Sequence, residues 1–203
     1  MDLSYARLRG ADLTGADLEG ADLSGADLEG AKLNNATLND AKLFLADLRN
    51  ALLDSANLIH ANLSFARLQG ASFKNAYLYG AELLGAGAQG ADLSKAKLEG
   101  ARLGLTKLQG ASLNRAQLQF AQLRGAQLQG ADLRGADLSA AYLFESVGLQ
   151  GAHLSETAMQ YSRVLGLNVW RAKITGCTNV LWRMCPPMRS CRSFRTRIRE
   201  PHT

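Results

Sequence analysis

The chain has 203 residues, of which 47% are hydrophobic, 20% charged and only 6% aromatic, and its formal net charge is +5. This balance excludes an intrinsically disordered chain, and the scarcity of aromatic residues excludes a conventional core of large, mixed side chains. The excess of positive charge belongs to the C-terminal end, because residues 182–203 hold six Arg against one acid, Glu200.

A five-residue repeat begins at the first residue and continues to residue 145. Counted in blocks of five from Met1, the first residue is Ala in 27 of 29 blocks and the third is Leu in 27 of 29. The exceptions are Met1 and Thr106 at the first position, and Phe73 and Ala88 at the third. The fifth residue is Gly in 14 blocks, and the second is usually polar.

This period predicts short extended segments joined by corners. In a helix, a period of five would rotate successive Ala-Leu pairs by about 140° and would spread Leu over the whole surface. The spacing of two between Ala and Leu instead places both side chains on one face of an extended segment. Gly or Asn at the fifth position favours a turn with positive φ. Repeated corners of one hand would wind the chain into a coil with Ala and Leu inside.

Large apolar residues at the outward positions indicate the length of one turn of this coil. At the fourth and fifth positions of the blocks they are Tyr5, Phe44, Leu45, Ile59, Phe65, Tyr79, Leu84, Leu105, Phe120 and Phe144. Counted modulo 20, seven of these ten residues fall at position 4 or 5, and the other three fall at 19 or 0. This clustering predicts a four-sided coil of 20 residues.

The pattern A-(D/N)-L-x-x resembles that of the pentapeptide-repeat family, as in "ADLTG", "ADLEG", "ANLIH", "ANLSF" and "ADLSA". The resemblance covers roughly residues 1–181. It implies an all-β fold, a right-handed quadrilateral parallel β-helix in which the central Leu and the Ala before it point inward. The number of blocks predicts about nine coils of 20 residues.

The regularity of the repeat divides the chain into three segments. Residues 1–145 are expected to form a regular β-helix, residues 146–181 degenerate coils, and residues 182–203 a basic, disordered tail. After Glu145 the frame slips by one residue, so we expect a one-residue bulge at Ser146–Gly148. The frame then resumes, with these residues at the central position: Leu149, Leu154, Met159, Val164, Val169 and Ile174. Trp170 and Trp182 are expected to cover the C-terminal end of the rod.

The third-position Ala88 predicts a weak point in the core. It stands where nearly every other block has Leu, and large-to-small changes in a core cost about 2–5 kcal/mol. We therefore expect a void beside Ala88.

The irregular apolar residues are the most specific candidates for a binding site. The candidate interaction residues are Phe44, Leu45, Phe65, Leu84, Leu105, Phe144, Tyr142 and Tyr79. On a 20-residue coil they would occupy one side, its corner and the adjoining side, and a contiguous exposed apolar surface marks an interaction site. The alternative is that corner side chains fold over the coil and stack on one another. The expected partners are an unidentified protein or a second copy of the chain, bound through these residues or through the ends of the rod.

The sequence predicts neither an enzyme nor a cofactor or metal site. A rod with flat sides has no cleft, and the three His residues (His60, His153 and His202) are scattered. Motifs for a nucleophile, a phosphate loop or a zinc site are absent. The three Cys residues (Cys177, Cys185 and Cys191) form an odd cluster, which favours a reducing compartment. With no signal peptide and no long apolar run, a cytoplasmic protein is predicted, and the family suggests a bacterial source.

Two functions fit these features. The first is a non-catalytic scaffold for protein interactions. The second, implied by the family, is a mimic of duplex DNA that binds and regulates a type II topoisomerase such as gyrase. Outward Asp residues such as Asp2, Asp12 and Asp17 would supply its negative charge, but residues 1–181 carry 17 bases against 17 acids. Binding of nucleic acid itself is expected at most through the basic tail.

Overall fold

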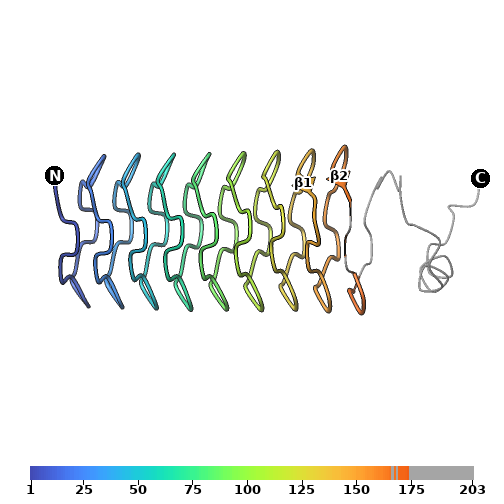
Figure 1. The fold of residues 1–203 in the computed structure, drawn as a ribbon, viewed down its shortest axis with the longest axis horizontal. Helices are drawn as coiled ribbons and strands as arrows, with labels where there is room; N and C mark the ends of the chain where they lie inside the picture. The colour runs from blue at the N-terminus through green and yellow to red at the C-terminus, as the bar shows by residue number, and fades with distance from the viewer. Residues whose placement is uncertain (166, 168, 174–203) are drawn as a thin grey trace, which may run out of the picture.

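The computed structural model describes residues 1–165, 167 and 169–173, which form a rod of stacked coils (Figure 1). The predictions for Ile174, the three Cys residues, Trp182 and the basic tail lie outside the described residues. The rod contains two strands, β1 (Tyr142–Leu143) and β2 (Arg163–Val164), which pair in parallel. The other backbone pairings between coils are single parallel β-bridges.

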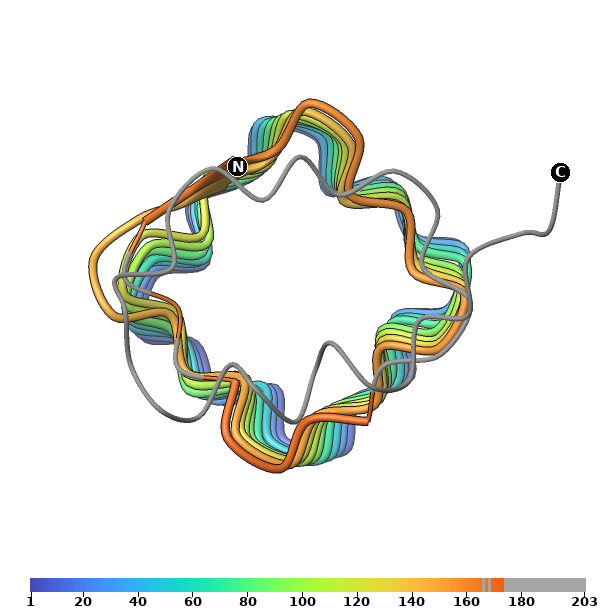
Figure 2. The ribbon, with the colours of Figure 1, turned by 90° about the vertical axis from the view of Figure 1, so that its right-hand side faces the viewer.

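Bridges between residues 20 positions apart stack the coils along the rod. They run from Asp2–Asp22 to Gln122–Tyr142 in an uninterrupted series, and each falls on the second residue of a block. One coil therefore takes four blocks, in agreement with the spacing of the outward apolar residues. Seen along the axis, successive coils superpose (Figure 2). Residues at equivalent positions consequently form ladders that run along the rod.

Each block ends in a β-turn that explains the repeated glycine. The N–H of the next block's first residue donates to the carbonyl of the central Leu, as from Ala6 to Leu3 over 3.1 Å. The fifth residue is the third residue of this turn, and its φ lies between 55° and 68° at every corner from Tyr5 to Glu145. Glycine adopts this conformation without the cost of about 1–2 kcal/mol that a Cβ adds.

The second-position Asp and Asn side chains fix the same corners. The Oδ1 atom of Asp2 accepts the N–H of Ser4 over 2.9 Å, and Asn62 and Asp137 accept those of Ser64 and Ser139 over the same distance. Such bonds define Asx turns, which hold the backbone in a bend. The five-residue pattern predicts only that these Asp residues lie outward and does not reveal their role in the turns.

The interior is a column of Ala and Leu layers. From Ala21 to Leu103, every first- and third-position residue is at most 1% exposed, as predicted. Two polar residues replace Ala inside the column, and the hydroxyl of each makes a hydrogen bond. The hydroxyl of Thr106 donates to the carbonyl of Leu83, and that of Thr157 to the carbonyl of Leu133, each over 2.7 Å. Buried hydroxyls are tolerated because they have such partners.

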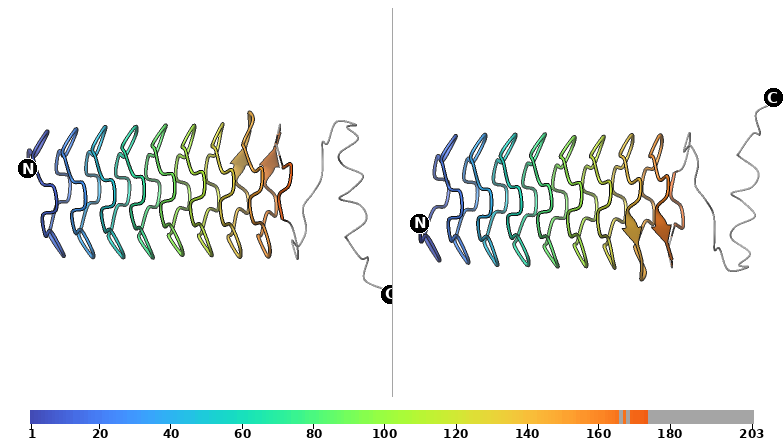
Figure 3. Two further views of the ribbon diagram at one scale, coloured as in Figure 1. Left: turned by 90° about the horizontal axis from the view of Figure 1, so that it is seen from below. Right: turned by 90° about the horizontal axis from the view of Figure 1, so that it is seen from above.

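A single extra residue shifts the register of the rod near its C-terminal end. The offset between paired residues changes from 20 at Gln122–Tyr142 to 21 at Gln127–Gly148. Glu145 and Ser146 have consecutive positive φ values of 55° and 63°. The predicted bulge therefore lies at Glu145–Ser146, one residue before the expected start, and beyond it Val147 and Leu149 are fully buried. Strand β1 ends just before this corner, and β2 lies beside it in the next coil (Figure 3).

Candidate protein-interaction surface

Five large apolar side chains form an exposed stripe along one corner of the rod. This apolar stripe consists of Phe44, Leu45, Phe65, Leu84 and Leu105. Their exposed fractions run from 39% for Phe44 to 58% for Leu105. All five occupy fourth or fifth positions of blocks that the 20-residue bridges stack on one another. The rings of Phe44 and Phe65 meet edge to face, with centroids 5.9 Å apart. The stripe is therefore continuous over four coils.

Three members of the stripe occupy backbone positions that disfavour large side chains. Leu45, Phe65 and Leu105 have φ values of 59°, 57° and 56°. A large side chain in this region costs about 1–2 kcal/mol, as it does at other corners without glycine, such as Phe120. Burial does not explain these residues, because each is about half exposed. Their conformational cost, together with their exposure, favours a role outside the fold itself.

Glycines follow two of these large residues along the same corner. A Cβ added at Gly85 would stand 2.7 Å from the ring of Phe65, and one at Gly125 would stand 2.7 Å from a methyl of Leu105. Phe65 and Leu105 thus each lean over the glycine of the following coil. The surface of the stripe is a series of apolar projections separated by low positions.

The other predicted interaction residues lie apart from the stripe. Tyr142 and Phe144 are half-buried and contact each other, with ring centroids 6.1 Å apart, and the guanidinium of Arg163 lies over the Tyr142 ring. Tyr79 is half-buried and contacts Tyr77, 6.4 Å between centroids. The structure thus divides the predicted set into the stripe and two separate aromatic pairs.

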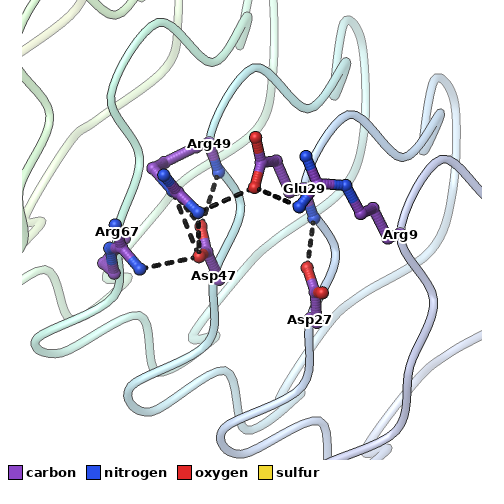
Figure 4. A network of polar contacts seen from close by, with 6 residues as sticks. All are labelled: Arg9, Asp27, Glu29, Asp47, Arg49 and Arg67. Atoms are coloured by element: carbon purple, nitrogen blue, oxygen red, sulfur yellow. Dashed lines mark hydrogen bonds and ion pairs between the residues drawn. The ribbon is translucent and has the colours of Figure 1, made fainter.

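Ion pairs between adjacent coils neutralise several of the acids in the first half of the rod. Six charged residues form the largest network: Arg9, Asp27, Glu29, Asp47, Arg49 and Arg67 (Figure 4). Arg49 bridges two coils, with 2.7 Å from its Nη2 to both Glu29 and Asp47. Elsewhere Asp12 pairs with Lys32, and Asp22 with Lys42, each over 3.5 Å. The surface is therefore of mixed sign.

The carboxylates of Asp27, Glu29 and Asp47 come close enough together to suggest a metal site, but arginines pair with Glu29 and Asp47, and Asp27 accepts the N–H of Glu29. Their nearest oxygens lie within 4.8 Å of one another. Burial raises the pKa of Asp47, but hydrogen bonds from Arg49 and the charge of Arg67 outweigh it, so its pKa lies below the ordinary value of 3.8. The network is a structural clamp between coils.

One surface hollow lies along a corner of the described rod. A shallow hollow of about 240 Å³ is lined by Asn114, Arg115, Arg134, Gly135, Ser155 and Glu156. Pockets that enclose ligands usually measure about 300–1,000 Å³ and are mostly apolar. In the part of the chain that the structure describes, no helix is long and apolar enough to cross a membrane.

Comparison with known proteins places these observations in a family. The family model described as pentapeptide repeats matches eight copies within residues 2–160. The solved structure of HetL, a pentapeptide-repeat protein involved in heterocyst differentiation regulation in the cyanobacterium Nostoc, is 34% identical; the match covers 85% of this chain and 80% of HetL, with a TM-score of 0.30. QnrB1, a plasmid-mediated fluoroquinolone resistance protein, is 20% identical over 86% of this chain and 87% of its own, with a TM-score of 0.51, and so shows a similar fold. A search of curated proteins finds no match.

Proposed function

Because the chain belongs to the pentapeptide-repeat family, we propose that it is a non-catalytic scaffold that binds a protein through the apolar stripe. The observation that carries this proposal is the run of exposed large apolar side chains over four successive coils at one corner of the rod. Glycine occupies the fifth position at many other corners. A solvated corner has no need of a large apolar side chain, whereas a binding surface does.

The proposal takes the rod to be a right-handed, four-sided coil of about nine turns. A solenoid of this kind is stiff, because each coil is bonded to both neighbours through the backbone. It presents side chains in straight ladders at the spacing between strands, about 4.8 Å. An apolar ladder on a stiff support loses little conformational entropy on binding, which favours affinity.

A triple variant tests this proposal. In Phe44→Ser/Phe65→Ser/Leu84→Ser the stripe loses most of its apolar surface, while all three side chains lie outside the core. The matched control is Leu52→Ser/Tyr77→Ser/Phe120→Ser, which removes three exposed apolar residues at other positions of the coil. Proteins retained by the immobilised wild-type rod should be lost with the first variant and kept with the second. If the two variants retain the same proteins as the wild type, the stripe is not the binding surface.

Mimicry of DNA by this rod is the less supported function. It would need a continuous negative face, because duplex DNA carries one charge per about 1.7 Å of its axis. The pairs Asp12–Lys32, Asp22–Lys42 and Glu82–Arg102 instead alternate the sign along the coils. A supercoiling assay with purified gyrase separates the two functions: inhibition or protection by the rod at stoichiometric amounts would favour mimicry over the scaffold.

A further inference from the structure

Along the corner that carries the apolar stripe, large and small residues are arranged in a complementary way on the two sides of Phe65. In successive coils the fifth residues of its blocks are Tyr5, Gly25, Leu45, Phe65, Gly85, Leu105 and Gly125. One coil away from Phe65 stand Leu45 on one side and Gly85 on the other. Two coils away stand Gly25 and Leu105, and three coils away Tyr5 and Gly125. At every distance from Phe65, a large side chain on one side matches a glycine on the other.

The charged residues beside this corner follow the same rule: those at equal distances from the coil of Phe65 have opposite signs. The second residues of the same blocks are Asp2, Asp22, Lys42, Asn62, Glu82, Arg102 and Gln122. One coil away from the coil of Phe65 stand Lys42 and Glu82, and two coils away stand Asp22 and Arg102. In both cases the two residues carry opposite charges. Within the chain these four residues form two ion pairs, Asp22–Lys42 over 3.5 Å and Glu82–Arg102 over 2.9 Å.

We propose that the apolar stripe binds a second copy of this chain, antiparallel, with a two-fold axis that passes between the two Phe65 residues. This inference rests on the proposed function and names the partner of the stripe. A two-fold axis perpendicular to the rods brings residues at equal distances from Phe65 face to face. Leu45 of one copy then faces Gly85 of the other, and Leu105 faces Gly25. At the fifth positions each projection other than Phe65 fits a low position, and Phe65 meets its own copy on the axis. At the fourth positions Phe44 faces Leu84, which makes an apolar contact.

The same operation brings opposite charges together on one side of the stripe. The axis keeps the second-position ladder of one copy opposite that of the other, because it reverses only the direction of the rod. Asp22 then faces Arg102, and Lys42 faces Glu82, and each contact occurs twice by symmetry. Charge complementarity of this kind fixes the register and orientation of an interface more than it adds affinity.

Other arrangements of the two copies lose the match of large with small residues or the match of opposite charges. A shift by one coil brings Leu45 against Leu105 and Lys42 against Arg102, or, in the other direction, Leu45 against Phe65 and Asp22 against Glu82. A parallel arrangement in register places every projection against itself and every glycine against glycine. The antiparallel register centred on Phe65 pairs large with small residues on either side of Phe65 in the fifth-position ladder and opposite charges in the second-position ladder, although the two ladders are independent parts of the sequence.

The contact fits within the regular part of the rod. Its seven coils, from Tyr5 to Gly125, span roughly 29 Å at about 4.8 Å per coil. The register shift at Glu145–Ser146 lies in the next coil, beyond the contact. Every residue of the interface thus keeps the 20-residue spacing that the symmetry needs.

Inverting one ion pair at a time tests the register without removing an ion pair from the fold. Asp22→Lys/Lys42→Asp keeps the pair between its two coils but places like charges against Arg102 and Glu82 of the second copy. Glu82→Arg/Arg102→Glu does the same from the other end. Light scattering and analytical ultracentrifugation should show a dimer for the wild type at about 100 μM. For each variant alone we expect a dissociation constant raised about tenfold or more, since four contacts become repulsive.

An equimolar mixture of the two variants gives the decisive result. In a heterodimer the changed position 22 of the first variant, now basic, would face the changed position 102 of the second, now acidic. Position 42, now acidic, would likewise face position 82, now basic, so all four contacts are again attractive. The mixture should therefore dimerise about as tightly as the wild type.

A matched inversion at another side of the coil serves as the control. Asp12→Lys/Lys32→Asp inverts the equivalent pair ten residues away along the chain. This control loses the Asx hydrogen bond from the N–H of Thr14 to Asp12, just as the first variant loses the one from the N–H of Ser24 to Asp22. The control should leave the dimer intact. Circular dichroism of each variant checks that the rod is folded.

Several outcomes would overturn the inference. A wild type that stays monomeric at about 100 μM excludes the second copy as partner. A dimer that the inversions do not weaken, or a mixture that does not recover, excludes this register. None of these results touches the scaffold function, because the triple stripe variant tests that function by the loss of other bound proteins.

Discussion

The ring of Phe65 lies over the backbone of Gly85 in the next coil, so that a Cβ at residue 85 would stand 2.7 Å from the ring's Cε1 atom. A side chain at residue 85 would therefore carry two costs: its φ is +65°, and the ring takes the space beside it. Tyr5 relates to Gly25 in the same way, and His60 to Gly80. The choice of residue at one corner thus depends on the residue 20 positions earlier.

Replacing Gly85 should be more harmful than replacing a glycine with free space. At Gly90, also a corner, nothing lies within 4 Å of the added Cβ. Gly90→Ala should cost about 1 kcal/mol, the conformational part alone, and Gly85→Ala about 2–3 kcal/mol, because the ring must also move. Denaturant unfolding measures both. In a Phe65→Ala background the two costs should become equal, and a persistent difference would show that the ring is not the cause.

Filling the small third position should stabilise the rod. Ala88 is 1% exposed in a ladder whose other residues from Leu8 to Leu128 are all Leu. Ala88→Leu should raise the free energy of unfolding by about 1–2 kcal/mol, since it adds buried apolar area where the coil is short of it. Ala86→Leu, at a fully buried first position, is the contrasting variant and should destabilise by overpacking. A loss of stability in Ala88→Leu would mean that neighbouring side chains already fill the space.

Deleting Ser146 should be tolerated. The deletion removes the extra residue at the shifted corner and leaves Val147 and Leu149 as the first and third residues of a block in the 20-residue frame. The melting temperature should then change by less than about 4 °C. Deleting Arg124, in a regular corner, breaks the frame for the coils that follow and should lower the melting temperature clearly. Equal losses for both deletions would show that the extra residue is required.

Acid should weaken the ion pair between Asp132 and Arg134 in a defined range of pH. Hydrogen bonds from the side chain of Arg134 hold the pKa of Asp132 below its ordinary value of 3.8, against the raising effect of burial. Both guanidinium contacts are short, 2.8 Å and 2.6 Å. A carboxylate with a lowered folded-state pKa contributes stability that is complete above its unfolded pKa.

That contribution should disappear as the pH falls from about 4 through the folded-state pKa of Asp132. Unfolding free energies of the wild type and Asp132→Asn, measured between pH 6 and pH 2, should therefore converge at the acid end. A gap that stays constant over this range would assign the effect of the substitution to packing or to a lost neutral bond.

The sequence determined the architecture through its period. Ala and Leu two residues apart, with a fifth residue suited to positive φ, allow only a coil with an apolar column. The spacing of the outward residues set 20 residues per turn, and the pairing from Asp2–Asp22 onward agrees with it. These features are local and repeated, so one block carries the information for all. The extra residue was also visible, because a change of frame displaces every later Leu.

The tertiary structure decided what depends on contacts between coils. Only the stacking shows that Arg49 joins two coils through Glu29. Only the stacking brings the ring of Phe44 against that of Phe65, and the guanidinium of Arg163 over the ring of Tyr142. Side chains 20 residues apart meet because the backbone bridges bring them together, and the direction in which each leans is set by space in the next coil. The five-residue repeat fixes where each residue stands, and the neighbouring coil fixes what it touches.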